Sequence, residues 1–151
     1  MYERAREWKY LHAGTPYVIV ARILVVDDNA PNRDLILYLL RAFGHEAQGA
    51  ADGLAGLEAA RSGAFDLVLS DILMPHMDGL DLLRALRDDP RLAECKIVAV
   101  TASAMVGDRE KLIQSGFDGY IAKPIDPEKF VGQVDSYLSP ALRSSTSWQR
   151  S

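Results

Sequence analysis

Four short apolar runs in this chain each end at polar side chains that can take part in chemistry. Short runs rich in Val, Ile and Leu, with helical patterns between them, are typical of strands in a parallel sheet. Ligands of such sheets bind outside the carboxyl ends of the strands. The polar residues that follow the runs should therefore gather in one pocket; they are Asp27 and Asp28, Asp71, Thr101 and Lys123.

The rest of the chain fits five strand–helix units in succession. We expect strands at residues 22–26, 46–50, 66–70, 96–100 and 119–122. We expect helices at residues 29–43, 52–62, 80–89, 104–115 and 126–138. Gly44 and Gly116 stand where two of these helices should end, as glycine often does. Strands that alternate with helices at this spacing predict a doubly wound α/β domain with five parallel strands and right-handed crossovers.

Composition narrows the class of protein. With 151 residues, 48% of them hydrophobic and 25% charged, the chain is long enough for one globular domain with a substantial core. The net charge of −4 at pH 7 gives no basic face for direct nucleic-acid binding. The single Cys95 excludes an internal disulfide, and no apolar stretch is long enough for a membrane helix. We therefore expect a cytoplasmic protein with an unreactive, partly buried thiol.

The two ends of the chain differ from its centre. We expect an N-terminal extension at residues 1–21, the folded domain at residues 22–138 and a disordered tail at residues 139–151. One hypothesis is that native translation starts at Val20, since residues 1–16 follow neither a strand nor a helix pattern. The alternative is a genuine extension that packs on the domain. N-terminal sequencing of the native protein would decide, and a peptide that contains Trp8 would contradict the late start.

The expected pocket suits a hard metal ion. Three neighbouring carboxylates repel one another, and a cation among them removes that cost. Mg²⁺ takes oxygen ligands and keeps several waters, so Asp28 and Asp71 suit direct contact and Asp27 contact through water. A backbone carbonyl just after Asp71 would complete the protein ligands. Taken alone, Asp27 and Asp28 would be better explained by a solvated loop or a helix cap, and it is the third acid and Lys123 that favour the metal site.

The other pocket residues point to phosphoryl transfer. A carboxylate beside Mg²⁺ can act as a nucleophile toward phosphorus, while the cation and an ammonium offset charge on the oxygens. Lys123 supplies an ammonium and Thr101 a hydroxyl, although each would be unremarkable as a surface lysine or a strand threonine. Lys123–Pro124 is a candidate cis peptide.

Five separated motifs resemble the receiver domain of two-component response regulators. They occur in the order and spacing of that family and span nearly all of the expected domain. The motifs are Ile23-Leu-Val-Val-Asp-Asp-Asn29, Leu67-Val-Leu-Ser-Asp-Ile-Leu-Met-Pro75, Met77-Asp-Gly79, Val98-Ala-Val-Thr-Ala102 and Tyr120-Ile-Ala-Lys-Pro124. The resemblance implies a flavodoxin-like sheet with strand order 2-1-3-4-5 and five helices.

The resemblance also implies a role for each pocket residue. Asp71 would accept a phosphoryl group from a phosphohistidine, held with Mg²⁺ that binds Asp27, Asp28, Asp71 and the backbone carbonyl of Leu73. Thr101 and Lys123 would contact the phosphoryl group. Tyr120 would turn inward when Thr101 moves, and the surface of the fourth helix, fifth strand and fifth helix would then change shape. Such a protein would be a switch rather than an enzyme, with only self-catalysed phosphorylation and slow autodephosphorylation.

The resemblance leaves the subtype open. The donor would be a histidine kinase or a histidine phosphotransfer protein, and the output would be contact with an unknown downstream protein. The region from Thr101 to Asp108 is similar to stand-alone receivers, and also to receivers fused to hybrid sensor kinases or multidomain regulators. We expect a monomer or weak dimer. Leu73 and Ser103 occupy positions that tune hydrolysis in this family, and an apolar Leu73 predicts a long phosphoryl lifetime.

Two alternative functions, from other classes of protein, remain. A phosphatase of the haloacid-dehalogenase type also uses Mg²⁺, Asp, Thr and Lys, but its Asp-x-Asp pattern is replaced here by Asp27-Asp28-Asn29. A pseudo-receiver that never takes phosphate would be expected to lack some of the pocket residues, all of which are present.

Overall fold

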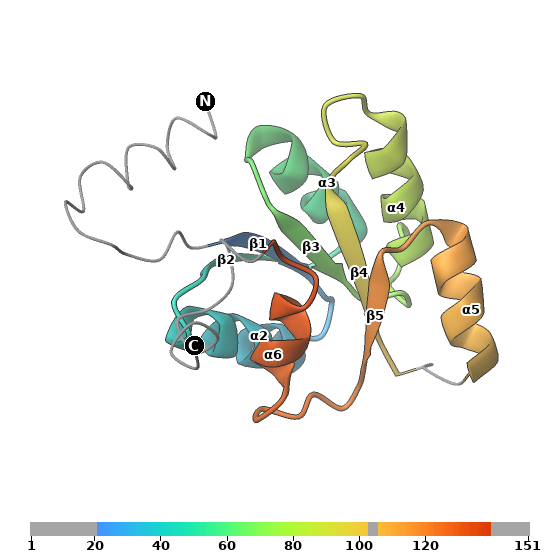
Figure 1. Cartoon of the computed structure of the whole chain (residues 1–151). Helices are drawn as coiled ribbons and strands as arrows, with labels where there is room; N and C mark the ends of the chain where they lie inside the picture. Colours follow the sequence, from blue (N-terminus) through green and yellow to red (C-terminus); the bar gives the residue numbers. More distant parts are fainter. Residues whose placement is uncertain (1–20, 103–105, 140–151) are drawn as a thin grey trace.

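The structure is a computed structural model that describes residues 21–102 and 106–139 (Figure 1). The expected N-terminal extension and tail lie almost entirely outside the described residues, as does Ser103. Their nature, like the predicted domain limits, stays a prediction. Among the described residues, no helix combines the length and the apolar character needed to cross a membrane.

Five parallel strands form one sheet. The strands are β1 (Arg22–Val26), β2 (Glu46–Ala50), β3 (Leu67–Ser70), β4 (Lys96–Thr101) and β5 (Gly119–Ala122). Their order across the sheet is β2-β1-β3-β4-β5, as predicted. Each pairing is parallel, so the carboxyl ends of all five strands point to the same edge.

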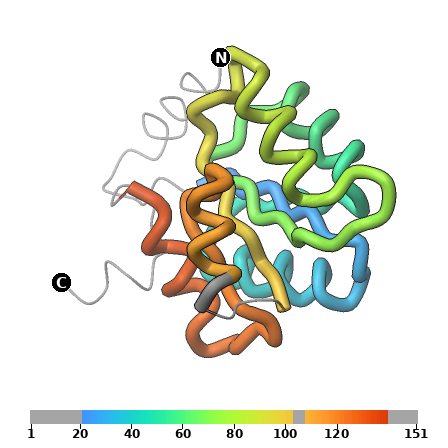
Figure 2. Tube along the Cα trace, turned by 90° about the vertical axis from the view of Figure 1, so that its right-hand side faces the viewer, coloured from blue at the N-terminus to red at the C-terminus, as the bar shows by residue number. Residues whose placement is uncertain are grey.

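Helices cover both faces of the sheet. They are α2 (Ala30–Ala42), α3 (Gly53–Ser62), α4 (Gly79–Asp88), α5 (Val106–Ser115) and α6 (Phe130–Asp135). Figures 1 and 2 show α2 and α6 on one face, and α3, α4 and α5 on the other. This is the doubly wound arrangement expected for strands linked by helical crossovers.

The side chains of the strands alternate between two apolar cores. In β1, Ile23 and Val25 join the core beneath α2 and α6, whereas Leu24 and Val26 join the core beneath α3, α4 and α5. Both faces are buried, which explains why β1, β3 and β4 read as continuous apolar runs rather than alternating ones. Because the sheet is closed on both faces, the polar residues beyond the strand ends are left at its edge.

Local sequence signals set most helix limits. Asn29 caps α2 by accepting a hydrogen bond from the backbone N–H of Asn32 at 2.9 Å. Asp78 and Asp81 form a reciprocal capping box at the start of α4. Gly44 and Gly116 have φ of +95° and +114°, the left-handed region that favours glycine after a helix.

The predicted last helix, residues 126–138, is wrong at both ends. The α-helix spans only Phe130–Asp135. Lys129 N–H donates to the Asp126 carbonyl, and Leu138 N–H to the Asp135 carbonyl. These two bonds span three residues rather than four, and the residues on both flanks form turns, although the Asp126 carbonyl also accepts from the Phe130 N–H four residues on. Smaller shifts occur in β3, which starts one residue later than predicted, and in β4, which includes Thr101.

Candidate functional site

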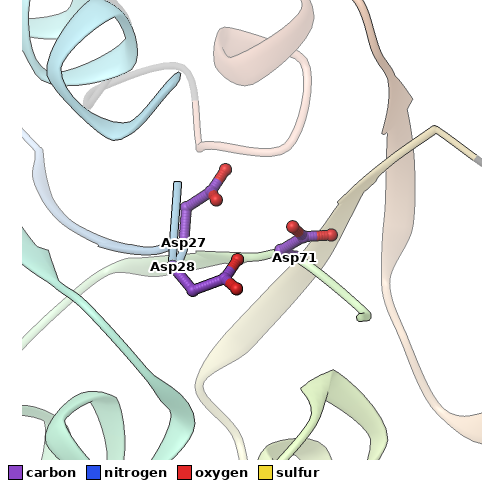
Figure 3. Close-up of side chains that lie close together, drawn as sticks. All are labelled: Asp27, Asp28 and Asp71. Atoms are coloured by element: carbon purple, nitrogen blue, oxygen red, sulfur yellow. The ribbon is translucent and has the colours of Figure 1, made fainter. Parts of the chain in front are cut away.

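Three aspartates meet at the carboxyl edge of the sheet (Figure 3). Asp27 and Asp28 follow directly after β1, and Asp71 follows β3, the neighbouring strand. Val26 pairs with Ser70 in the parallel register, so the residues that come next lie side by side. The predicted gathering of these acids is confirmed, and its cause is the adjacency of β1 and β3.

The three carboxylates are close enough to share one ion. One oxygen from each lies within 4.8 Å of the others. Asp27 and Asp71 are only 1% and 9% exposed, whereas Asp28 is exposed. In Figure 3 the side chain of Asp28 extends toward Asp71. A set of oxygens that is partly buried and open to solvent on one side suits a cation that keeps several waters.

Lys123 brings a positive charge into this cluster. Its Nζ lies 3.0 Å from Oδ2 of Asp71 and 3.1 Å from Oδ2 of Asp27. Burial alone would lower the pKa of Lys123, but the hydrogen bond to Asp71 and the negative charges of Asp71 and Asp27 raise it above its usual value. The ammonium is therefore charged at neutral pH and offsets part of the repulsion among the acids.

The two carboxylate oxygens of Asp27 differ in their hydrogen bonds. Its Oδ1 accepts a hydrogen bond from the N–H of Asn29 at 2.9 Å. Its Oδ2 is buried and accepts no hydrogen bond from any residue that the structure describes, and its contact with Lys123 is an ion pair without hydrogen-bond geometry. A buried carboxylate oxygen is rarely left in this state. Together with Asp28 and Asp71, it gives hard oxygen donors that fit Mg²⁺.

The paired ends of β4 and β5 place Thr101 beside the backbone of Lys123. Thr101 is the last residue of β4, is 2% exposed and pairs with Ala122. The backbone N–H of Lys123 donates to the Thr101 carbonyl at 2.9 Å. The Lys123–Pro124 peptide is cis, as predicted.

Tyr120 lies on the edge strand β5, which β4 separates from β3 and Asp71. It belongs to β5, pairs with Ala99 and is half-buried against the core beneath α3, α4 and α5. The guanidinium carbon of Arg109 lies 4.7 Å from the centroid of its ring.

The loop from β3 to α4 folds back over Asp71. The N–H of Ile72 donates to Oδ1 of Asp71 at 2.7 Å, and the N–H of Gly79 donates to the Ile72 carbonyl. A Cβ at Gly79 would collide with the carbonyl oxygen of Asp71, so this close approach requires glycine. In the same loop, the side chain of Leu73 is 74% exposed and His76 is exposed with φ of +67°.

Sequence reasoning missed two arginines near the site. Arg33 Nη1 donates to the backbone carbonyl of Asp27 at 2.8 Å, and its Cδ would lie 3.1 Å from a Cβ at Gly49. The sequence did contain a signal for Arg33, because it is a basic residue in the first turn of the helix that follows Asp27 and Asp28. Arg109 gave no such signal, because its contact with Tyr120 joins a helix to the following strand and depends on the tertiary structure.

Comparison with known proteins places the chain in a family. The profile of the response regulator receiver domain matches residues 23–135. The polar-differentiation response regulator DivK of Brucella anthropi is 40% identical over 119 residues, which cover 79% of this chain and 97% of that protein. DivK of Brucella ovis is similar to the same degree.

Solved structures agree with the sequence comparison. The chemotaxis response regulator CheY4 of Vibrio cholerae has a TM-score of 0.75 and 28% identity, covering 79% of this chain and 99% of that one. The receiver domain of the Pseudomonas aeruginosa sensor histidine kinase PA1611 has a TM-score of 0.71 and 31% identity, covering 78% and 97%. That structure holds a magnesium ion coordinated in the active-site cleft. Together, the matched profile, the relatives and the fold show that this chain belongs to the receiver domains of two-component response regulators.

Proposed function

We propose that Asp71 accepts a phosphoryl group from a phosphohistidine on a histidine kinase or a histidine phosphotransfer protein. Receivers of this family are phosphorylated by histidine kinases, and the finer assignment rests on one observation. The ammonium of Lys123 lies within 3.1 Å of a carboxylate oxygen of both Asp71 and Asp27, at the edge where three acids converge. This arrangement supplies a nucleophile, a fixed positive charge and oxygen ligands in one place.

The proposed transfer needs little covalent chemistry from the protein. An Asp71 oxygen forms a bond to phosphorus as the phosphorus–nitrogen bond of the donor breaks, and the electron pair and a proton pass to the donor imidazole. Ile72 and Lys123 each donate to one oxygen of the Asp71 carboxylate, which orients it. As the phosphoryl group arrives, Lys123 would move its ammonium onto the new oxygens, and the Thr101 hydroxyl would donate to another.

Asp27, Asp28 and Asp71 are the residues that would hold Mg²⁺, with the Leu73 carbonyl as a further ligand. Their support is the 4.8 Å grouping of the three carboxylates and the buried Oδ2 of Asp27, which pairs with Lys123 but accepts no hydrogen bond from the described residues. When bound, the ion supplies positive charge to the phosphoryl oxygens during transfer.

The proposed output is a change of surface. Movement of Thr101 toward the phosphoryl group would vacate space that the Tyr120 ring can fill, and α5, β5 and α6 would then present a different face to a partner protein. The half-buried state of Tyr120, neither free nor fully enclosed, supports a ring that can take two positions.

Two protein contexts suit this receiver. A stand-alone regulator is favoured by the 40% identity to DivK across 97% of that protein. A receiver that belongs to a hybrid sensor kinase or multidomain regulator is the alternative, favoured by the 31% identity to the PA1611 receiver.

Intact mass after incubation with Mg²⁺ and acetyl phosphate tests the proposal. We expect one added phosphoryl group on the wild type, and none on Asp71→Asn or after removal of Mg²⁺. Asp88→Asn is the matched control, since Asp88 is exposed at the end of α4, and it should behave as the wild type. Phosphate on Asp71→Asn would contradict the proposal. No phosphate on the wild type, even with a phosphohistidine protein as donor, would favour a pseudo-receiver.

A further inference from the structure

The ring of Tyr120 is held from outside by a cation. The guanidinium carbon of Arg109, an exposed residue of α5, lies 4.7 Å from the ring centroid. A guanidinium within about 6 Å of an aromatic face is attracted by the negative charge of the ring face. This contact joins α5 to β5 through a side chain for which we propose two positions.

The backbone of Tyr120 is fixed, so any movement belongs to its side chain. Tyr120 pairs with Ala99 in the centre of the β4–β5 ladder. Its carbonyl accepts a hydrogen bond from Oη of Tyr137 at 3.4 Å. The Tyr137 ring occupies the space that a side chain at Gly119 would need, which locks the start of β5 in place.

Rotation of the ring inward would break the contact with Arg109. The ring already touches the core beneath α3, α4 and α5 but is only half-buried. Arg109 is exposed at the outer surface. A ring that turns further into the core therefore moves away from the guanidinium, and the attraction favours the outer position.

The contact matters for α5 because residues 108–115 of that helix are mostly exposed. Among residues 108–115, Leu112 is buried at 8% exposure, whereas all the others are half-buried or exposed. A helix with few buried contacts opens or shifts at low cost. Among residues 108–115, the Arg109–Tyr120 contact and the burial of Leu112 both tie the helix to the domain.

We infer that Arg109 is a positioning residue that holds the Tyr120 ring outward and thereby biases the receiver toward its resting state. The inference rests on the proposed function, because it assumes that Tyr120 responds to phosphorylation of Asp71. Loss of the cation should shift the balance toward the inward state by about two- to five-fold, the effect typical of an exposed cation–π pair. A ligand that selects the inward state would then bind more tightly by the same factor.

Beryllofluoride mimics a phosphoryl group. Its titration in the presence of Mg²⁺ therefore measures the balance between the outward and inward positions of the Tyr120 ring. Binding is followed by the amide resonances around Asp71. The variants are Arg109→Gln and Arg109→Lys, with Lys111→Gln as the control for lost charge on an exposed position of α5. A second measurement needs neither Mg²⁺ nor beryllofluoride. The NMR resonance of the Tyr120 ring, assigned by comparison with Tyr120→Phe, reports directly on the contact with Arg109.

We expect Arg109→Gln to lower the apparent Kd by about two- to five-fold. Arg109→Lys should give a smaller change and Lys111→Gln none. The effect of Arg109→Gln should vanish when Tyr120 is already Ala, because the two residues act as a pair. The Tyr120 ring resonance should shift in Arg109→Gln and stay in place in Lys111→Gln.

Two outcomes would overturn the inference, and they are distinguishable. If the wild type binds beryllofluoride and Arg109→Gln binds it equally well or more weakly, the role of Arg109 is wrong and the proposed function stands. If the wild type does not bind beryllofluoride at all, the proposed function fails, and the inference fails with it.

Discussion

Lys123 Nζ lies 3.0 Å from Oδ2 of Asp71, although the two residues are 52 positions apart in the sequence. The same nitrogen lies 3.1 Å from Asp27. The parallel sheet creates this meeting, since it carries the ends of β1, β3 and β5 to one edge. A single ammonium thus faces the proposed phosphoacceptor and a proposed metal ligand.

Replacement of Lys123 by Met should slow phosphoryl transfer to Asp71 by about 10²-fold, because the ammonium no longer offsets charge on the transferred oxygens. The rate is measured with acetyl phosphate at saturating Mg²⁺, which limits the repulsion among the acids that remain. Lys111→Met, on the exposed face of α5, should keep the wild-type rate. Transfer at the wild-type rate in Lys123→Met would remove Lys123 from the mechanism.

Gly79→Ala should damage both the fold and the site. Its Cβ would collide with the Asp71 carbonyl oxygen and lie 2.9 Å from Cα of Ile72. We expect the free energy of unfolding to fall by about 1–3 kcal/mol and phosphorylation to slow. Gly132→Ala is the matched control, since its Cβ would meet nothing within 4 Å and alanine favours the α6 helix. Urea unfolding of both variants tests this, and equal stabilities would show that the loop can move aside.

The exposed side chain of Leu73 predicts a long phosphoryl lifetime. It is 74% exposed and apolar, so it has no group to orient an attacking water. Leu73→Gln should shorten the half-life by about tenfold, the effect of one hydrogen bond worth roughly 1.4 kcal/mol. Leu54→Gln, at another exposed leucine, should leave it unchanged. Loss of the label from purified phosphoprotein gives the half-life, and a value of seconds for the wild type would refute the prediction.

Asp66 lies outside the candidate site, and it should make the stability of the protein depend on pH. Burial raises its pKa to about 6, despite the hydrogen bond that its Oδ2 accepts from the Arg22 N–H. The folded chain therefore holds this proton longer than the unfolded chain, and stability falls as pH rises from about 4 to about 6. Asp66→Asn should remove this slope.

At pH 7 the same substitution should stabilise the protein by about 1 kcal/mol, a value reduced for partial exposure of the carboxyl group. Urea unfolding from pH 4 to pH 8 measures both effects. A less stable Asp66→Asn at pH 7 would mean that the contacts of the carboxylate outweigh its burial.

Much of the fold could be predicted because its signals are local. The apolar runs, Asn29 as a cap and Gly44 after a helix each act within a few residues, and the strand order came from the family resemblance. The length of α6 could not be predicted, because the turns at Asp126 and Asp135 include bonds that span three residues and the sequence pattern does not distinguish these turns from a helix.

The residues of the site could also be predicted where their signals are local, but its long-range contacts could not. Its main residues follow strand ends, and parallel strands place those ends together. Contacts that join distant elements left no pattern. Buried His45 Nε2 lies 3.0 Å from Oδ1 of Asp135, 90 residues away, while its Nδ1 accepts from the Ala21 N–H at 3.4 Å. The pair forms because α6 packs against α2, and His45 lies in the turn between α2 and β2.

The most direct test of the central claim is the position of the phosphoryl group after transfer from a phosphohistidine protein. Borohydride reduction converts an aspartyl phosphate to homoserine, which peptide mass spectrometry then locates. We predict homoserine at position 71 alone, and none when Mg²⁺ is withheld. Homoserine at position 27 would contradict the receiver mechanism and favour a phosphatase-like nucleophile after β1.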